Sequence, residues 1–276
     1  AIDLDAGITT DSGSLTFTGP VNINGTVALD TGNGGTSTTA GNVTITGIVS
    51  ANDGTGDVLR IAADGSTTDG DIEFQADVDG TQDLDGLTIS AANQVDFQDV
   101  VLDGSLAVTA TNIDLNTDVY TVAAGGDITF TGAVDLDQSG GTSTITGGGA
   151  SGDDISFTAT IDDGIANDTA LTLVAGSGAV SLAGDAGVTT ALGAFTVSSA
   201  ATADLNDVVA SSIAVTATNI DLNTDVYTSS ASITLTGTVD LDQTGGTTTI
   251  TSGAAADEDI SITGTIDDAS SDTTLS

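Results

Sequence analysis

The chain has no cysteine, histidine, lysine, methionine or tryptophan, and it contains a single arginine and a single proline. Without cysteine there are no disulfide bonds and no thiolate chemistry. Without histidine, cysteine or lysine, the chain also lacks the side chains that usually activate a nucleophile or move protons near neutral pH. We therefore expect a protein that is not an enzyme and has no catalytic residues.

Positive charge is almost absent, because Arg60 stands against 40 acidic residues and the net charge is −39. Such a surface repels the phosphates of nucleic acids and of anionic lipids, so we expect neither as a partner. No apolar run approaches the ~20 residues needed to cross a bilayer, so we expect no membrane insertion in this segment. Two explanations of the acidity stay open: divalent cations held among the carboxylates, or a solvated surface that keeps the protein soluble.

The chain contains a long sequence repeat. The block AVTATNIDLNTDVYT occurs at 107–121 and again at 214–228. The tripeptide IDL starts at positions 2, 113 and 220, so successive copies are nearly evenly spaced along the chain. We expect one continuous segment, 1–276, made of super-repeats at 1–111 and 112–218 and a partial one at 219–276. Because both ends fall inside the repeat and no initiator methionine is present, we expect a piece of a longer repetitive protein.

Apolar residues alternate with Thr, Ser or Asp over short runs such as LTF at 15–17 and ISF at 155–157. A period of two residues is typical of strands with one buried face, and no segment has the 3.6-residue period of a helix. Single small pairs, Gly132-Ala133 and Gly237-Thr238, each separate two strand-like runs and are expected to form turns. The sequence therefore predicts an all-β protein.

A super-repeat of this length divides into about five turns of ~20 residues, which is the size of one coil in a parallel β-helix. The predicted fold class is therefore a parallel β-helix (β-solenoid) with about five ~20-residue coils per super-repeat of about 105–110 residues. Ile, Val, Leu and Ala would fill a narrow core that admits few aromatic rings. The alternative is a string of immunoglobulin-like sandwiches, since ~100 residues is also the size of one such domain. The absence of tryptophan and the strand pattern that continues through the boundaries favour the β-helix.

The blocks ITFTGAVDL, ALTLVAGSGAVSLAGDAG, TTALGAFTVSSAA and IAVTATNIDL resemble the β-strand repeats of very large secreted bacterial surface proteins, namely the filamentous-haemagglutinin-like and autotransporter-like adhesins. The resemblance covers nearly the whole chain and concerns architecture more than activity. It implies a right-handed parallel β-helical stalk or fibre outside the cell.

From the composition, the repeat and this resemblance we expect a non-enzymatic, extracellular structural repeat at the cell surface. It would form a rigid stalk, fibre or surface layer for adhesion or matrix formation. The expected partners are neighbouring repeats, other copies in a fibre, and a glycan or another cell-surface ligand. Two alternatives stay open: a calcium-dependent adhesion module of tandem immunoglobulin-like sandwiches, and the stalk of a polysaccharide-acting β-helix enzyme.

The strongest candidate site for a metal ion is Asp114-x-Asn116-x-Asp118, which recurs as Asp221-x-Asn223-x-Asp225. It imitates the first ligands of an EF-hand loop, but valine replaces the required glycine and the final glutamate is missing. On a strand the three side chains would share one face. Acidic clusters beside turns are the other candidates, although Asp and Asn also satisfy the backbone groups of turns. The residues expected to hold a metal ion, with Ca²⁺ as the candidate cofactor, are Asp114, Asn116, Asp118, Asp221, Asn223, Asp225, Asp153, Asp154, Asp162, Asp163, Asp257, Asp259, Asp267 and Asp268.

Overall fold

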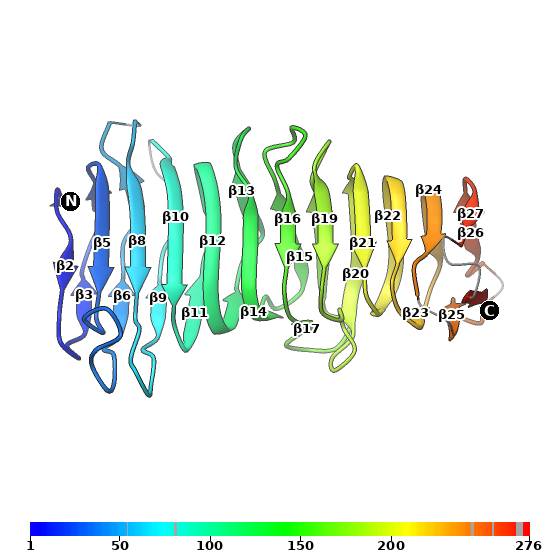
Figure 1. The fold of residues 1–276 in the computed structure, drawn as a ribbon, viewed down its shortest axis with the longest axis horizontal. Helices are drawn as coiled ribbons and strands as arrows, with labels where there is room; N and C mark the ends of the chain where they lie inside the picture. Colours follow the sequence, from blue (N-terminus) through cyan, green and yellow to red (C-terminus); the bar gives the residue numbers. More distant parts are fainter. Residues whose placement is uncertain (54, 80–81, 244–245, 256, 269–272) are drawn as a thin grey trace. The chain divides into compact units, whose positions relative to one another are not determined.

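The computed structural model describes residues 1–53, 55–79, 82–243, 246–255, 257–268 and 273–276, and these residues form β-strands and no helix (Figure 1). The predicted all-β class is therefore confirmed. Within the same residues, no helix meets the length and apolar character that crossing a membrane requires. The chain divides into two compact units, Ala1–Val134 and Asp135–Ser276. The division into super-repeats at 1–111, 112–218 and 219–276 stays a prediction.

The first unit contains β1 (Ile2–Leu4), β2 (Ile8–Thr9), β3 (Leu15–Phe17), β4 (Val21–Ile23), β5 (Thr26–Asp30), β6 (Val43–Ile45), β7 (Val49–Ala51), β8 (Val58–Ala62), β9 (Ile72–Phe74), β10 (Leu84–Ala91), β11 (Gln94–Phe97), β12 (Val100–Leu115) and β13 (Val119–Val122). Strand β14 (Ile128–Leu136) includes the boundary between the units. The second unit contains β15 (Gly141–Thr146), β16 (Ile155–Phe157), β17 (Ile161–Asp163), β18 (Thr169–Val174), β19 (Ala179–Leu182), β20 (Leu192–Ser199), β21 (Thr202–Leu205), β22 (Val208–Leu222), β23 (Val226–Ser229), β24 (Ile233–Leu241), β25 (Gly246–Thr251), β26 (Ile260–Thr263), β27 (Ile266–Asp267) and β28 (Thr273–Leu275).

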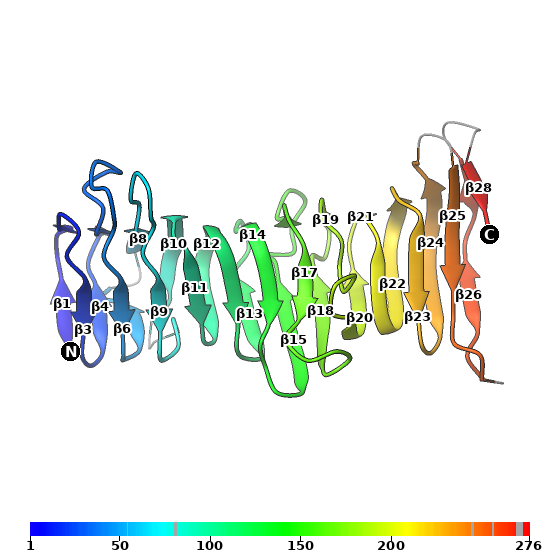
Figure 2. The ribbon, with the colours of Figure 1, turned by 90° about the horizontal axis from the view of Figure 1, so that it is seen from below.

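Strands from successive passes of the chain lie side by side and pair in parallel. In the first unit, β3, β6, β9, β11 and the end of β12 form one such series (Figure 2). In the second unit, β16, β19, β21 and the end of β22 do the same (Figure 1). Because neighbouring strands lie ~4.8 Å apart, residues in register stack into ladders of similar side chains.

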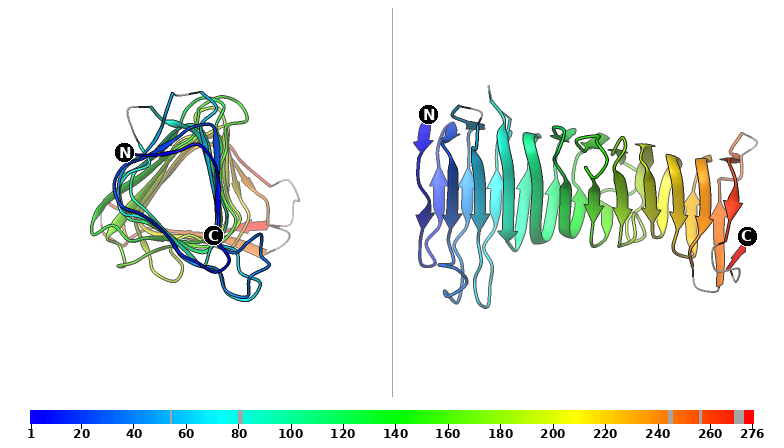
Figure 3. Two further views of the ribbon diagram at one scale, coloured as in Figure 1. Left: turned by 90° about the vertical axis from the view of Figure 1, so that its left-hand side faces the viewer. Right: turned by 45° about the horizontal axis from the view of Figure 1, so that its top comes forward.

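The predicted alternation is confirmed by burial. Strands such as β16 and β19 bury the apolar positions and leave the intervening serine partly exposed. Figure 3 shows the strands following one another around an interior. Most large apolar side chains of each unit are buried. β-Branched Val, Ile and Thr suit a pleated, half-buried surface, which is why short runs of them form strands without a helix to support them.

Aromatic side chains are few, as expected, but each of the six phenylalanines and both tyrosines is buried in the core. Phe74 and Phe97 stack with ring centroids 5.3 Å apart and planes 12° from parallel. Tyr227, from the repeated DVYT block, donates a hydrogen bond to the carbonyl of Leu205 at 2.8 Å. Burial raises the pKa of Tyr120 and of Tyr227 to about 12. The repeated tyrosine therefore fills the interior of each unit as a neutral, hydrogen-bonding ring.

The predicted β-helix requires correction, because the main sheet closes on itself as a parallel barrel of ten strands, with further strands outside it. The physical reason lies in two long strands. Strand β12 pairs with β13 through its first residues, with β10 through its middle and with β11 through its last residues. Strand β22 likewise pairs with β23, β20 and β21 in succession. One strand thus joins sheets that a β-solenoid would keep on separate faces.

The predicted coil length of ~20 residues is also wrong as a uniform value. Ala203 pairs with Ile220, and Val27 pairs with Leu59. The second of these steps along the chain is almost twice as long as the first. The loops between the strands differ in length, so two strands that pair are separated by different numbers of residues along the chain. The alternative of tandem immunoglobulin-like sandwiches is contradicted as well, because sandwich sheets are antiparallel and the described pairings between these strands are parallel.

The expected turns at Gly132-Ala133 and Gly237-Thr238 are absent. Strands β14 and β24 each continue through the pair as one strand of nine residues. The glycines have φ angles of +137° for Gly132 and +147° for Gly237, so each bends its strand without ending it. A small pair between two apolar runs therefore marks a bend in these strands.

Candidate functional site

The predicted Asp114-Asn116-Asp118 row does not lie on one strand face, because β12 ends at Leu115. Asp114 is half-buried on the strand and accepts a hydrogen bond from Nε2 of Gln94 at 2.6 Å. Asn116 follows the strand and donates its Nδ2 to the carbonyl of Phe97 at 3.0 Å. Asp118 is exposed in the turn before β13. The side-chain amide of Asn116 thus donates its hydrogen bond to the backbone of the neighbouring strand.

The second copy of this motif has the same plan. Asp221 is half-buried near the end of β22. Asn223 follows the strand and donates its Nδ2 to the carboxylate of Asp204. Asp225 is exposed and accepts a hydrogen bond from Nε2 of Gln243. In this copy, therefore, a side-chain amide bonds the carboxylate of the neighbouring strand.

The acidic pairs near β16 and β17 hold their own turns and the next strand. Asp153 is buried and accepts a hydrogen bond from the backbone nitrogen of Ala150 at 2.9 Å. Asp154 accepts one from the backbone nitrogen of Ala179 at 2.7 Å. Asp162 accepts hydrogen bonds from the backbone nitrogens of two residues, Thr189 and Thr190, both at 3.0 Å.

Asp163 is 2% exposed and accepts hydrogen bonds from the backbone nitrogens of Asp168 at 2.8 Å and Thr169 at 2.9 Å. Asp268 has the same role in the next copy, accepting one from the nitrogen of Thr273 at 2.9 Å. Carboxylates that satisfy turn backbone groups are a common structural feature.

The remaining predicted ligands lie near the last strands. Asp257 and Asp259 are exposed, and the backbone nitrogen of Asp259 donates to Oγ of Ser232 at 3.3 Å. Asp267 is exposed on β27 and accepts a hydrogen bond from the backbone nitrogen of Asp268 at 2.9 Å. Across the described part of the chain, no group of three or more acidic side chains has an arrangement that could hold a metal ion. Binding of Ca²⁺ therefore stays a prediction.

What the structure does bring together is a stack of four aspartates in the second unit, hereafter the aspartate ladder. Asp204 pairs in register with Asp221, Asp221 with Asp240, and Asp240 with Asp267. Each side chain lies on the polar side of its strand, next to apolar neighbours that are buried in the first three strands. Like charges directly opposite each other on adjacent strands repel. Of these four residues, only Asp221 and Asp267 were predicted from the sequence as metal ligands, and as members of two separate sites.

A shorter acidic series stands in the first unit, where Glu73, Asp96 and Asp114 pair in register. Nε2 of Gln94 donates to Asp96 at 2.9 Å as well as to Asp114, so one amide separates two carboxylates. The sequence signal for both series is an apolar–acidic–apolar triplet that returns with each pass, as in IEF, VDF and IDL. The varying return length hides this signal from a search at a fixed period.

Burial and neighbouring carboxylates raise the pKa of two aspartates in the second unit. For Asp221 the larger cause is burial, and the charges of Asp242, Asp204 and Asp240 add to it. For Asp135 the larger cause is again burial, followed by the charges of Asp137, Asp162 and Asp163. Oδ1 of Asp135 is also buried without a hydrogen-bond partner. Both carboxyl groups are therefore easier to protonate than an aspartate in water.

A raised folded-state pKa means that the native protein binds a proton more tightly than the unfolded chain. Tighter proton binding by the native state adds to the free energy of unfolding. This contribution is fully present below the ordinary aspartate pKa of ~3.9 and is lost as the pH rises through the raised pKa. We therefore expect Asp221→Asn to increase the free energy of unfolding at pH 7 by roughly 0.2–1 kcal/mol, and to have no such effect near pH 3.5. Urea denaturation at the two pH values measures this difference.

The matched control for that substitution is Asp257→Asn, which removes the same charge from an exposed residue outside the aspartate ladder. An equal stabilisation by both variants would attribute the effect to net charge and would contradict a role for the ladder. High salt should shrink the effect of Asp221→Asn, because screening weakens repulsion between partly exposed carboxylates.

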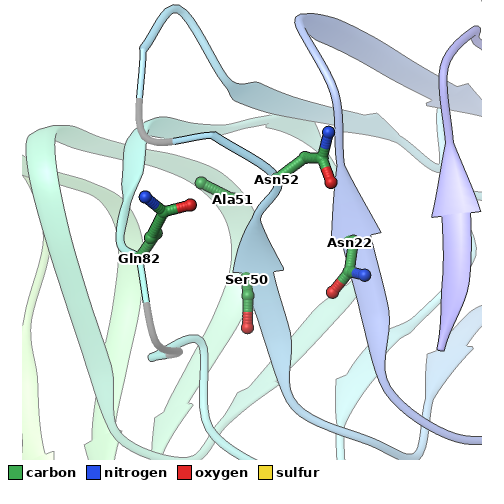
Figure 4. A pocket seen from close by; sticks show the side chains of 5 residues that line it. All are labelled: Asn22, Ser50, Ala51, Asn52 and Gln82. Carbon is green, nitrogen blue, oxygen red and sulfur yellow. The ribbon is translucent and has the colours of Figure 1, made fainter.

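A polar hollow of about 360 Å³ lies on the surface of the first unit (Figure 4). Its lining residues are Asn22, Ser50, Ala51, Asn52 and Gln82. Asn22 and Ser50 are paired in register on β4 and β7, and Nδ2 of Asn22 donates to Oδ1 of Asp3 at 2.8 Å. Amide and hydroxyl groups offer hydrogen bonds without a charge of their own, which suits an uncharged polar ligand better than an ion. No sequence pattern indicates this hollow.

Comparison of the chain with models of protein families, with curated proteins and with solved structures finds no match.

Proposed function

We propose that this protein is a non-enzymatic structural repeat of the cell surface, which builds a stalk, fibre or surface layer for adhesion or matrix formation. The observation that carries the proposal is how the repeated blocks pack. Strand β24, from the block SITLTGTVDL, pairs in parallel with β22, which contains the block AVTATNIDL, from Ile213 with Ile233 to Leu222 with Leu241. In the preceding copy of both blocks, β14 pairs with β12. The sequence repeat is therefore also a packing repeat, in which each block needs the next to bury its apolar side chains.

The chemistry of the acidic side chains supports a structural role over a catalytic one. A glycosidase needs two carboxyl groups directed at a substrate. Here Asp162 and Asp163 accept hydrogen bonds from backbone nitrogens, and so do Asp267 and Asp268 in the next copy. Arg60, the single side-chain cation, is exposed on β8, where it pairs with Ala28 and Thr88.

The surface suits a crowded extracellular setting. A net charge of −39 keeps copies of the chain soluble and disfavours contact with nucleic acid and anionic membranes. The polar hollow around Asn22, Ser50 and Asn52 offers uncharged hydrogen-bonding groups of the kind that contact sugar hydroxyls. A glycan or another uncharged cell-surface ligand is therefore the external partner that we propose for the adhesive role.

The location of the protein on intact cells of its source tests the proposal. Antibodies raised against residues 1–276 should label unpermeabilised cells in immunogold electron microscopy. Brief treatment of intact cells with a protease should remove that label while a cytoplasmic marker protein stays intact. A label that emerges only after the cells are permeabilised would contradict the surface role.

A further inference from the structure

The loop between β17 and β18 exposes residues 164–168 to solvent one after another. Its backbone nevertheless has a fixed position. The nitrogen of Asn167 donates to the carbonyl of Ala191 at 2.6 Å, in the loop between β19 and β20. The nitrogen of Thr189 in that second loop donates to Oδ1 of Asp162 at 3.0 Å. The two loops therefore lie side by side.

Each of these loops exposes one large apolar side chain. Ile165 is 63% exposed and Val188 is 51% exposed, the two highest values among the large apolar side chains that the structure describes. Strands β18 and β20, which follow the two loops, are each paired on both sides, so this exposure does not arise at an end of the strand series. Exposed apolar side chains that lie together indicate a surface that another group covers.

The first of the two loops also contains an acceptor motif for a modification. Asn167 begins the sequence Asn-x-Thr, which is the acceptor motif of N-linked glycosylation when x is not proline. Position x is Asp168, and the hydroxyl residue is Thr169. Asn167 is exposed, and within the described part of the chain its side-chain amide makes no hydrogen bond. A glycan on this amide would therefore break no contact of the folded chain.

The same motif begins at Asn24 and at Asn42, but the amides there are already in use. Nδ2 of Asn24 donates to Oδ1 of Asp5 at 2.8 Å. Nδ2 of Asn42 donates to Oδ2 of Asp71 at 3.4 Å. Both amides connect neighbouring passes of the chain, which the amide of Asn167 does not do.

We propose that Asn167 carries an N-linked glycan whose first sugars cover Ile165 and Val188. A sugar ring presents C–H groups as well as hydroxyl groups, so it removes apolar side chains from water while it stays solvated itself. The sugars next to the protein are uncharged, because the carboxylates of Asp162 and Asp168 beside the loop would repel an acidic sugar.

Attachment of the glycan is a group transfer from a glycosyl phosphate donor, made by a transferase of the source cell. Nδ2 of Asn167 forms a bond to C1 of the first sugar and loses one proton. The bond between C1 and the phosphate oxygen of the donor breaks, and the phosphate leaves with that electron pair. The amide keeps one N–H group, so a neutral secondary amide joins the glycan to the chain.

The burial of Thr169 indicates when the transfer takes place. The motif requires the hydroxyl group of this residue. In the folded chain Thr169 is 0% exposed, and its Oγ1 donates to the carbonyl of Gln138 at 2.6 Å. The transferase therefore meets its acceptor before β18 packs, and a chain that has folded without the glycan should not accept one.

The inference rests on the proposed surface function, because the motif is used in secreted proteins, but the two fail separately. A protein that is labelled on intact cells while its Asn167 is unmodified would overturn the glycan and leave the surface role standing. A protein found only inside the cell would overturn the surface role, and an unmodified Asn167 in that protein would overturn the glycan as well.

Mass spectrometry of peptides from the protein purified from its source cells tests the proposal. We expect most copies of the wild type to carry sugar masses on Asn167, and Asn167→Asp to lose them. Aspartate keeps the turn, because it tolerates the φ angle of +64° as asparagine does. Thr169→Ser keeps the hydroxyl group and should keep the glycan, whereas Thr169→Val should lose it. An unmodified Asn167 in the wild type, or a glycan that Thr169→Val retains, would overturn the proposal.

Enzymatic release of the glycan tests the cover over the apolar pair. Binding of a neutral apolar dye should rise several-fold when the glycan is released from the wild type. It should not rise in the double variant Ile165→Ser, Val188→Ser, which keeps the acceptor motif. Equal dye binding before and after release would contradict the covering role. An unmodified wild-type chain recovered with another protein bound at Ile165 would overturn the proposal in favour of a protein partner.

Discussion

Replacing Phe97 by alanine is expected to lower the free energy of unfolding by about 3–5 kcal/mol. Phe97 is 0% exposed and stacks against Phe74 with ring centroids 5.3 Å apart. It also pairs in register with Leu115, so the ring has a packed neighbour on each adjacent strand. Removing the ring leaves a cavity between two strands whose positions are fixed by backbone pairing, and the walls cannot collapse to fill it. Urea denaturation followed by circular dichroism measures the loss.

Two further substitutions separate the cavity from other effects of changing this residue. Phe97→Leu keeps most of the volume and is expected to cost less than about 1.5 kcal/mol. Phe17→Ala removes a ring at the outer end of the same series of strands, where β3 has a paired neighbour on one side, Ile45 on β6. Its expected cost is smaller than that of Phe97→Ala. Equal losses at Phe17 and Phe97 would contradict the argument that packing on both sides sets the magnitude.

The strands and their buried positions were predictable from sequence because burial on one face imposes a period of two. The runs around Ile155, Val180 and Ile220 show this pattern and lie in strands with those residues inside. Such a pattern needs only local information, because the side chain directions follow from the extended backbone. The same reasoning correctly excluded helices.

The closure of the sheet was not predictable from the same pattern. It depends on β12 and β22 staying extended for 16 and 15 residues while their pairing partner changes along the way. Gly104 and Ser105 within β12, like Ser211 and Ser212 within β22, resemble turn residues in sequence. Ser105 pairs with Gly86 on β10, and Ser212 pairs with Ala194 on β20. Such pairing keeps these stretches in the strand, and it is a tertiary property that local composition does not reveal.

The acidic residues of the candidate site were likewise predictable only where local sequence was enough. Turn carboxylates such as Asp163 were found from sequence, but their backbone partners were not, because several turn nitrogens are equally close in the chain. The aspartate ladder was missed because its members, at positions 204, 221, 240 and 267, are unevenly spaced in the sequence. Loop length sets this spacing, and loops of these units have no regular length. Only the register of the strands shows that the four carboxylates are neighbours.

A large backbone effect is expected for Gly237→Ala, which should lower the free energy of unfolding by about 2–5 kcal/mol. Gly237 has a φ angle of +147°, which a residue with a Cβ rarely adopts. A Cβ at this position would also lie 2.1 Å from the carbonyl oxygen of Ala217 on the adjacent strand. That oxygen belongs to the backbone of β22 and cannot move without disturbing its pairing with β24. Chemical denaturation of the variant gives the size of the loss.

Gly149→Ala is the matched control, because it has a positive φ angle of +84° but open space where the Cβ would be added. It should cost only the conformational strain, about 1–2 kcal/mol. The difference between the two variants then measures the steric conflict between neighbouring strands. Because Gly264 lies against Gly237 in the same way, with its Cβ position 1.9 Å from the Gly237 oxygen, Gly264→Ala should resemble Gly237→Ala more than Gly149→Ala. Equal losses for Gly237→Ala and Gly149→Ala would show that the bend tolerates a side chain, and that close strand approach does not require glycine there.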